Sequence, residues 1–269
     1  MRPGVLHTRT RLDGILAAVE ERLDHRRARA PLAELQARTA ERPGGGRERF
    51  VAALGTRELA VIAECKRRSP SEGAIAEARN MSELAHTYAT FGAAALSVLT
   101  EQDHFGGNLE DLVRTESAGL PRLRKDFVID EYMVLESAAH GADAVLLLAI
   151  CLDDHLLRDL REQARELGLA VLLEVHDEAE LARALPLAPD CLGVNARDLR
   201  SFEVDLGTVE RLLPLAGEAC LKVAESGIHG WAELERVRRA GADAVLCGTA
   251  LMRSPPRLAE WTARLEAGA

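Results

Sequence analysis

The chain has 269 residues, of which 47% are hydrophobic, and a formal net charge of −9 at pH 7. This length and apolar content suit one large buried core and leave no room for a second full domain. Nucleic acid and anionic membrane surfaces are bound through a positive field, so the acidic balance argues against both, and any phosphate must be held locally.

The N-terminal part of the chain, residues 1–46, is predicted to be a helical extension. Apolar residues recur at helical spacing between about residues 10 and 40, with Arg and Glu at most other positions. This apolar stripe consists of Leu12, Ile15, Leu16, Val19 and Leu23. Pro43 and the three glycines after it end the pattern, because glycine carries too much backbone entropy to continue a helix. We therefore place a flexible hinge there, before a second unit, residues 47–269.

From residue 59 onward, eight short apolar runs alternate with longer amphipathic stretches. The runs are 60–65, 93–99, 121–124, 144–150, 170–173, 191–194, 220–224 and 244–247. Each lies roughly 20 to 30 residues from the next, which leaves room for one crossover helix per unit, as parallel strands require. Eight such units predict an α/β fold, a (β/α)8 TIM barrel, in residues 47–269.

A short repeat accompanies the predicted strands. The segment GADAV at 141–145 recurs at 241–245, and a degenerate copy, GAAAL, occupies 92–96. In each copy the glycine would supply the left-handed residue that ends a helix, and the apolar residues would begin a strand. Chance recurrence in an Ala-rich chain is the alternative, but the copies fall in phase with the strand count.

The cysteines and the apolar runs exclude further classes of protein. The five cysteines are widely spread without a C-x-x-C pair, which predicts reduced, mostly buried strand residues and no zinc site or disulfide framework. The longest apolar run, 144–152, is far shorter than the roughly 20 residues of a membrane helix, and the Arg- and Glu-rich start has no signal-peptide pattern. We expect a cytoplasmic protein that spans no membrane.

Lysine is rare in this chain. The 34 Lys and Arg residues include only three lysines, Lys66, Lys125 and Lys222. A lysine kept against this bias suggests a site that needs a compact ammonium or a titratable amine, which a guanidinium cannot supply. Lys66 and Lys125 stand at the C-terminal ends of predicted strands, where barrel enzymes carry their active sites. Lys222 has strand parity opposite to Glu225 and is expected to face the helices or solvent.

Other polar residues stand at the ends of the predicted strands. Residues two apart on a strand share a face, so Glu64 joins Lys66 at the barrel mouth. The other rim groups are Glu174, Asn195, Arg197 and Glu225. A solvated rim charge is the alternative for any one of them. Several charges that point into a barrel must be paired or used, because burial of an unpaired charge is costly.

Two loops are candidates for binding phosphate. Ser226 and Gly227 follow the seventh predicted strand, and Gly248 and Thr249 follow the eighth. These loops are the usual phosphate site of the barrel, where backbone N–H groups and helix N-termini can bind an anion even in an acidic protein. Ser69, in the S-P-S segment 69–71, is a weaker candidate.

Six segments, in this order, resemble the indole-3-glycerol phosphate synthase family. They are AECKRRSPS at 63–71, LSVLTE at 96–101, LRKDF at 123–127, LEVH at 173–176, GVNARDL at 193–199 and AESGI at 224–228. The resemblance implies a carbon–carbon lyase of tryptophan biosynthesis that needs no cofactor or metal. Its substrate would be 1-(2-carboxyphenylamino)-1-deoxyribulose 5-phosphate, which becomes indole-3-glycerol phosphate with loss of CO2 and water.

The resemblance also implies catalytic roles for three residues. Lys125 would protonate the sugar carbonyl as the aromatic carbon attacks it. Glu174 would be the acid and base for loss of the hydroxyl. Lys66 would bind the substrate's carboxylate or phosphate and assist the acid chemistry. Positioned proton donors of this kind are what developing charge on a carbonyl oxygen and a departing hydroxide require.

Further residues would bind the substrate. The substrate-binding set is Glu64, Ser69, Phe127, Asn195, Arg197 and Glu225, and the phosphate-binding set is Lys66, Ser69, Ser226, Gly227, Gly248 and Thr249. Phe105, Phe127 and Leu147 are candidate apolar walls around the carboxyphenyl ring, with ordinary core packing as the alternative. In the family the N-terminal helix covers the barrel mouth, which matches the predicted extension.

Two alternatives stay open. A phosphosugar isomerase or Schiff-base aldolase on the same barrel would also need lysine and carboxylates near a phosphate site, but it would not predict this order of segments. A catalytically silent barrel that acts as a partner subunit is the non-enzyme alternative, against which the intact Lys66, Lys125 and Glu174 speak. Association with other enzymes of the tryptophan pathway, and a duplicate's role in a specialised pathway, are left open.

Overall fold

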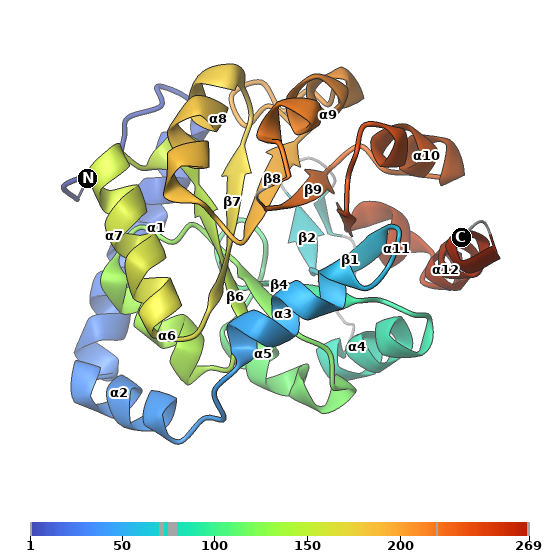
Figure 1. The fold of residues 1–269 in the computed structure, drawn as a ribbon. Helices are drawn as coiled ribbons and strands as arrows, with labels where there is room; N and C mark the ends of the chain where they lie inside the picture. The colour runs from blue at the N-terminus through green and yellow to red at the C-terminus, as the bar shows by residue number, and fades with distance from the viewer. Residues whose placement is uncertain (1, 70–72, 75–79, 219, 268–269) are drawn as a thin grey trace.

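Eight parallel strands close into a barrel in the order β1-β10-β9-β8-β7-β6-β5-β4 (Figure 1). The strands are β1 (Ala60–Cys65), β4 (Ala95–Leu99), β5 (Arg122–Lys125), β6 (Ala144–Leu148), β7 (Ala170–Val175), β8 (Cys191–Asn195), β9 (Leu221–Glu225) and β10 (Ala244–Cys247). A separate antiparallel pair, β2 (Arg68–Ser69) and β3 (Gly73–Ala74), follows β1. The computed structural model describes residues 2–69, 73–74, 80–218 and 220–267, with only the backbone at 69, 73 and 74. The predicted barrel is confirmed, and each predicted run overlaps one of its strands.

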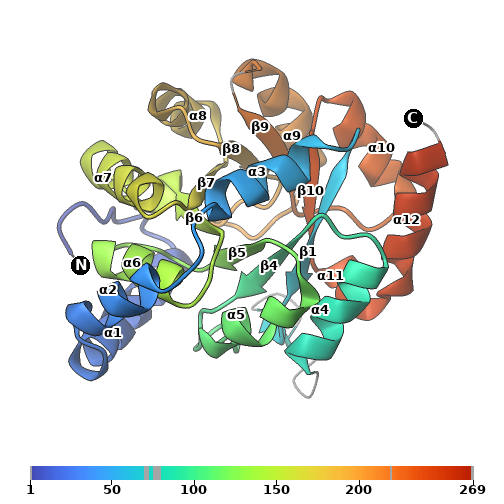
Figure 2. The same cartoon turned by 60° about the horizontal axis from the view of Figure 1, so that its bottom comes forward.

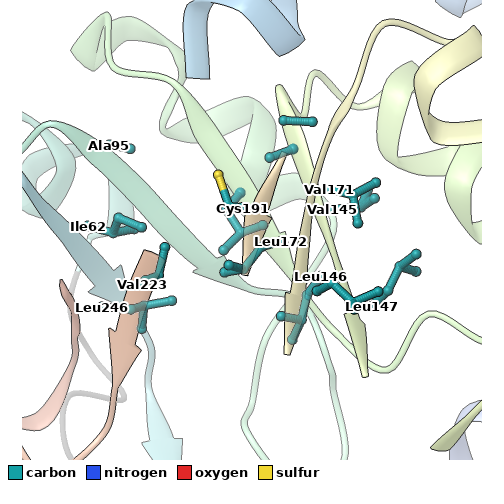
Figure 3. Close-up of a cluster of buried hydrophobic side chains, with 14 of the residues drawn as sticks. Ile62, Ala95, Val145, Leu146, Leu147, Val171, Leu172, Cys191, Val223 and Leu246 are labelled. Carbon is teal, nitrogen blue, oxygen red and sulfur yellow. The ribbon is translucent and has the colours of Figure 1, made fainter. Parts of the chain in front are cut away.

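Burial on both faces explains why these strands are continuous apolar runs. Every residue of β1, β4, β6, β7, β8 and β10 is buried. One face of each strand points into the barrel and the other is covered by helices, so neither face needs polar residues. Figure 3 shows part of this core, with Ile62, Leu172 and Val223 from three different strands among the buried side chains.

Helices surround the barrel, and those that lie between β1 and β10 in the sequence connect successive strands. They are α1 (Arg11–Arg29), α2 (Leu32–Ala40), α3 (Gly46–Gly55), α4 (Met81–Thr90), α5 (Glu110–Arg114), α6 (Glu131–Ala139), α7 (Asp154–Glu166), α8 (Glu178–Ala184), α9 (Leu206–Leu212), α10 (Trp231–Arg239), α11 (Thr249–Arg253) and α12 (Pro256–Ala267), with 3-10 turns η1 (Glu116–Ala118), η2 (Ala149–Cys151), η3 (Leu185–Leu187) and η4 (Leu213–Ala216). The repeated glycines Gly92, Gly141 and Gly241 follow α4, α6 and α10 with φ of 89°, 86° and 90°. This confirms the left-handed helix ends predicted from the repeat.

Helix α3 closes the end of the barrel opposite to the carboxyl ends of the strands (Figure 2). The Arg47 N–H donates to the Gly168 carbonyl at 2.8 Å, and Arg49 Nη1 lies 3.2 Å from Asp143 Oδ1. Gly168 and Asp143 precede β7 and β6, so both contacts lie at the amino ends of these strands. The predicted division at residue 46 coincides with the start of α3, and as a domain boundary it stays a prediction.

The predicted N-terminal helical region consists of two helices rather than one, because Pro31 interrupts it before α2. All five residues of the apolar stripe on α1 are buried. The Tyr132 hydroxyl donates to the carbonyls of Arg26 and Ala30, and Arg22 Nη2 lies 2.6 Å from Asp103 Oδ1. Helix α1 thus packs against segments that follow β4 and β5. Its role as a cover over the barrel mouth stays a prediction.

Four of the five cysteines are buried and Cys220 is half-buried. Burial raises the pKa of the Cys247 thiol to about 12, so this thiol stays protonated at neutral pH. Of the helices in the described ranges, none has both the length and the apolarity to cross a membrane.

Candidate active site

One cavity opens among the loops at the carboxyl ends of the strands, and the predicted site residues converge on it. The predicted residues that line it are Glu64, Lys66, Lys125, Phe127, Glu174, Asn195, Arg197, Glu225, Ser226, Gly227, Gly248 and Thr249. They come from six strands or strand ends that are far apart in the sequence. The side chain of Ser69, together with residues 70 and 71, lies outside the described residues.

In the lining of the cavity, Lys125 lies between two carboxylates. Its Nζ is 3.0 Å from Glu174 Oε2 and 2.9 Å from Glu225 Oε2. The other oxygen of Glu174 accepts a hydrogen bond of 2.9 Å from Asn195 Nδ2. The strand register places these groups together, because Asn195 pairs with Glu225 and Glu174 pairs with Gly193 on the intervening strand. Groups on β5, β7, β8 and β9 therefore form one cluster.

The contacts within this cluster shift the pKa values of its members in different directions. Burial alone would lower the pKa of Lys125, but the charges of Glu174 and Glu225 outweigh burial and raise it. Burial and the charge of Glu174 raise the pKa of Glu225 to about 8. Burial would also raise the pKa of Glu174, yet Lys125 and then His176 and Asn195 lower it well below its usual value. Around neutral pH the cluster thus holds an ammonium, an ionised Glu174 and a carboxyl, Glu225, that can carry a proton.

Two glycines make room for these carboxylates. A Cβ at Gly193 would overlap Oε1 of Glu225, and a Cβ at Gly248 would overlap Oε1 of Glu64. Gly193 lies on β8 and Gly248 directly follows β10, and a side chain at either position would take the space of an acid. Gly193 is the first residue of the segment GVNARDL, but the sequence alone did not indicate a role for it.

Glu64 and Lys66 form the second charged pair of the cavity, on the strand face that their spacing predicts. Lys66 Nζ lies 2.7 Å from Glu64 Oε1, and both side chains are about nine-tenths buried. Gly248 lies beside the pair, since its Cβ would come within 2.8 Å of Lys66 Nζ. The pair therefore adjoins the loop after β10.

The cavity has an apolar wall as well. Phe105 and Phe127 line it with ring centroids 6.4 Å apart and planes tilted by 41°. Leu146 and Leu148 line it too, whereas the predicted wall residue Leu147 does not. The prediction of Leu147 was wrong by one position. Side chains alternate along a strand, so Leu147 points to the outer face while its neighbours point inward.

The loop after β4 presents Phe105 to the cavity, and Glu101 holds that loop in shape. The Glu101 carboxylate accepts hydrogen bonds from the backbone N–H groups of Asp103, His104 and Phe105 at 3.0, 2.8 and 3.0 Å. Glu101 is buried and lines the cavity. Sequence reasoning missed it, because nothing in the segment indicates that its carboxylate turns back onto its own loop.

At the other side of the cavity, the loops after β9 and β10 come together. Ser226 and Gly227 both have left-handed backbones, with φ of 64° and 73°. A left-handed conformation is uncommon for a residue with a side chain and costs energy, so at Ser226 it marks a site where the surroundings impose it. Gly248 and Thr249 complete this side.

Lys222 lies outside this cavity, as its parity predicts. Its Nζ would lie 3.7 Å from a Cβ at Gly241, which ends α10 at the opposite end of the barrel. Among the described residues, no cluster of three or more His, Cys, Asp or Glu is arranged to hold a metal ion.

Comparison with known proteins shows which family this chain matches. A family profile described as "Indole-3-glycerol phosphate synthase" matches residues 12–261. The chain is 48% identical over 245 residues to a protein of that name from Nocardioides sp., covering 90% of this chain and 93% of the relative. It is 49% identical over 240 residues to a protein of the same name from Parafrankia sp., covering 89% of each.

A solved structure shares the fold at much lower sequence similarity. The thiamine phosphate pyrophosphorylase from Pyrococcus furiosus superposes with a TM-score of 0.58 at 16% identity, covering 78% of this chain and 97% of that one. At this identity the likeness shows the barrel fold alone.

Proposed function

Given that this chain belongs to the indole-3-glycerol phosphate synthase family, we propose that Lys125 and Glu174 carry the proton transfers of its reaction. The enzyme is a decarboxylating lyase of tryptophan biosynthesis. It converts 1-(2-carboxyphenylamino)-1-deoxyribulose 5-phosphate to indole-3-glycerol phosphate, with loss of CO2 and water. The observation that carries the proposal is the contact of Lys125 Nζ with both Glu174 and Glu225 inside one cavity.

Ring closure needs a proton at the sugar carbonyl. As the aromatic carbon attacks the carbonyl carbon, the oxygen becomes negative, and the ammonium of Lys125 stabilises it and supplies the proton. The two carboxylates keep this lysine charged, because they raise its pKa against the effect of burial. Cleavage of the bond to the carboxylate then releases CO2 and restores the aromatic ring.

Loss of the hydroxyl needs an acid and a base. Glu174 is ionised and lies beside Lys125, so it first takes the proton that leaves the ring carbon and then gives a proton to the departing hydroxide, which leaves as water. Glu225, whose pKa is raised to about 8, is held next to the same ammonium and lines the same pocket. Asn195 orients Glu174 and Glu64 orients Lys66.

Substrate binding divides between the two sides of the cavity. The carboxyphenyl ring packs on Phe105 and Phe127, where an apolar surface favours loss of the charged carboxylate. Lys66 and Arg197 bind anionic or polar groups of the substrate, with Ser69 as a further predicted contact. The phosphate binds where the loops after β9 and β10 meet, at Ser226, Gly227, Gly248 and Thr249. Lys66 and Ser69, which follow β1, complete the predicted phosphate-binding set.

A matched pair of lysine variants tests this proposal. Lys125→Ala should lower turnover by roughly 10²- to 10⁴-fold, the usual worth of a positioned proton donor. Lys222→Ala removes a lysine outside the cavity and should leave turnover close to that of the parent enzyme. Fluorescence of the indole product measures both, and circular dichroism checks that both fold. Near-normal turnover of Lys125→Ala would reject its role as the acid.

The wider setting of the enzyme is part of the same proposal. The phosphorylated substrate is the small-molecule partner, and the net charge of −9 supports the absence of nucleic acid binding. We place the enzyme in the cytoplasm and leave room for association with other enzymes of the tryptophan pathway.

A further inference from the structure

Behind Glu174, a buried histidine lies between two carboxylates. His176 directly follows β7, and its Nε2 lies 3.1 Å from Glu174 Oε1 while its Nδ1 lies 3.0 Å from Glu180 Oε2. Residue exposures of 1%, 7% and 5% for Glu174, His176 and Glu180 exclude most water from this row. His176 does not line the cavity. Its chemistry must therefore act through Glu174.

The start of α8 explains why Glu180 is there. Asp177 is the N-cap residue of α8 and accepts the N–H of Glu180 at 2.9 Å. Glu180, at the third helical position, reaches back and accepts the backbone N–H of His176 at 2.8 Å. This reciprocal arrangement resembles a capping box, displaced by one residue. The helix start thus holds a carboxylate against the far side of the imidazole ring.

The contacts in this row of Glu174, His176 and Glu180 also determine how Glu174 is oriented. Oε2 of Glu174 faces Lys125, and Oε1 faces Asn195 and His176. A carboxylate with a cation on each oxygen cannot rotate freely. It also stays ionised, because each neighbouring positive charge favours the charged form.

We propose that His176, kept as an imidazolium by Glu180, is a positioning residue that holds Glu174 ionised and correctly turned for its proton transfers. This inference rests on the role proposed above for Glu174. It adds a residue that does not touch the cavity to the machinery of the reaction.

The surrounding charges support the imidazolium. Burial alone would lower the pKa of His176, but Glu174 and Glu180 raise it to about 10. Lys125 and Arg200 lie beyond these carboxylates, with Arg200 Nη2 3.5 Å from Glu180 Oε1. The nearby Cys151 thiol stays protonated, because burial and the same two carboxylates raise its pKa well above its usual value. The ring therefore lies within 3.1 Å of a carboxylate oxygen of each of the two acids.

The test compares His176→Gln with Glu174→Gln across pH. Glutamine can still donate one hydrogen bond but carries no charge, so the pKa of Glu174 should rise and the acid limb of the kcat/KM profile should move to higher pH. Turnover should fall roughly 10- to 100-fold through misplacement of Glu174, while KM changes little. Loss of packing alone would lower stability without moving the limb. The exposed His155→Gln on α7 is the matched control.

The two variants separate the failure of this inference from that of the proposed function. If Glu174→Gln is inactive and His176→Gln keeps the parent turnover and pH profile, the positioning role alone is overturned. If Glu174→Gln is fully active, the role of Glu174 falls and the positioning role falls with it. An inactive Glu174→Gln with a slowed, shifted His176→Gln supports both.

A second measurement needs no variant to fold. In enzyme labelled with ¹⁵N in its histidine rings, one ring should keep protons on both nitrogens at pH 8, where an ordinary histidine is neutral. If this signal is missing from folded His176→Gln, it is assigned to His176. Absence of any doubly protonated ring at pH 8 overturns the inference.

Discussion

Gly193 shows how a residue without a side chain can determine the chemistry of its neighbours. It stands on β8 between Glu174 and Glu225, and a methyl group there would occupy the place of Oε1 of Glu225. That oxygen is buried and has no hydrogen-bond partner among the described residues. In the part of the chain that the structure describes, only the contact of the other oxygen with Lys125 therefore holds the carboxylate in place against a side chain on β8.

Gly193→Ala should consequently displace Glu225 and break its 2.9 Å contact with Lys125. We expect turnover to fall roughly 10- to 100-fold, since small misplacements of catalytic groups have effects of this size. Gly14→Ala is the control, because its Cβ would meet nothing within 4 Å. At an exposed position near the start of α1, that change should leave turnover intact and raise stability by up to about 1 kcal/mol. Product fluorescence and thermal unfolding measure the two effects, and a Gly193→Ala enzyme with parent turnover would contradict the steric argument.

Among the secondary-structure elements, β5 carries Lys125 inward and a second cation outward. Arg124 is fully buried, with Nη2 2.9 Å from Asp126 Oδ2 and Nη1 3.1 Å from Glu136 Oε2 on α6. Arg26 of α1 approaches the other oxygen of Glu136 at 3.1 Å. One buried network thus connects the strand that holds Lys125 to α6 and to the N-terminal helix.

Arg124→Met should destabilise the fold by roughly 3–5 kcal/mol, because it removes the paired cation of buried Asp126 and leaves buried Glu136 with Arg26 alone. Arg238→Met is the matched comparison, since Arg238 pairs with Glu58 and Glu235 on the surface. Exposed pairs are screened by water, so the comparison variant should unfold near the parent midpoint. Urea denaturation followed by circular dichroism measures both. Equal losses of stability in the two variants would show that burial of the network does not matter.

The elements also show what the sequence could and could not predict. The strands were predictable because six of the eight are short runs buried on both faces. The helix ends at Gly92, Gly141 and Gly241 were predictable because only glycine adopts their backbone easily. The break at Pro31 was missed, since the apolar stripe before it suggested one helix to about residue 40. The outward Arg124 was missed because its partners on α6 come from a different part of the chain.

For the whole molecule, closure of the barrel is what turns a list of rim residues into a site. Strand parity predicted that Glu64, Lys66 and Lys125 would face inward, and the closed sheet brings them to one cavity. Parity could also have selected Leu148 in place of Leu147. The contact between His176 and Glu180 could not be predicted, because it depends on how α8 leaves the barrel.

The free energy of unfolding should depend on pH, because closure of the barrel buries titratable groups next to one another. The pKa of His176 is raised from 6.5 to about 10, so its contribution to stability is fully present below pH 6.5 and is lost as pH rises through 10. The pKa of Glu225 is raised from 4.5 to about 8, so its contribution is present below pH 4.5 and lost through pH 8. Both groups make the folded enzyme less stable toward alkaline pH.

His176→Gln isolates one part of that loss. The difference in free energy of unfolding between parent and variant should shrink by about 2 kcal/mol or more between pH 6 and pH 10. The reason is that each unit of pKa difference between the folded and the unfolded protein corresponds to about 1.4 kcal/mol. Urea denaturation at several pH values measures it, and the exposed His155→Gln provides a curve that should run parallel to the parent. A difference that stays constant over this range would mean that His176 does not bind a proton more tightly in the folded enzyme. That result would contradict the ion pairs of His176 with Glu174 and Glu180.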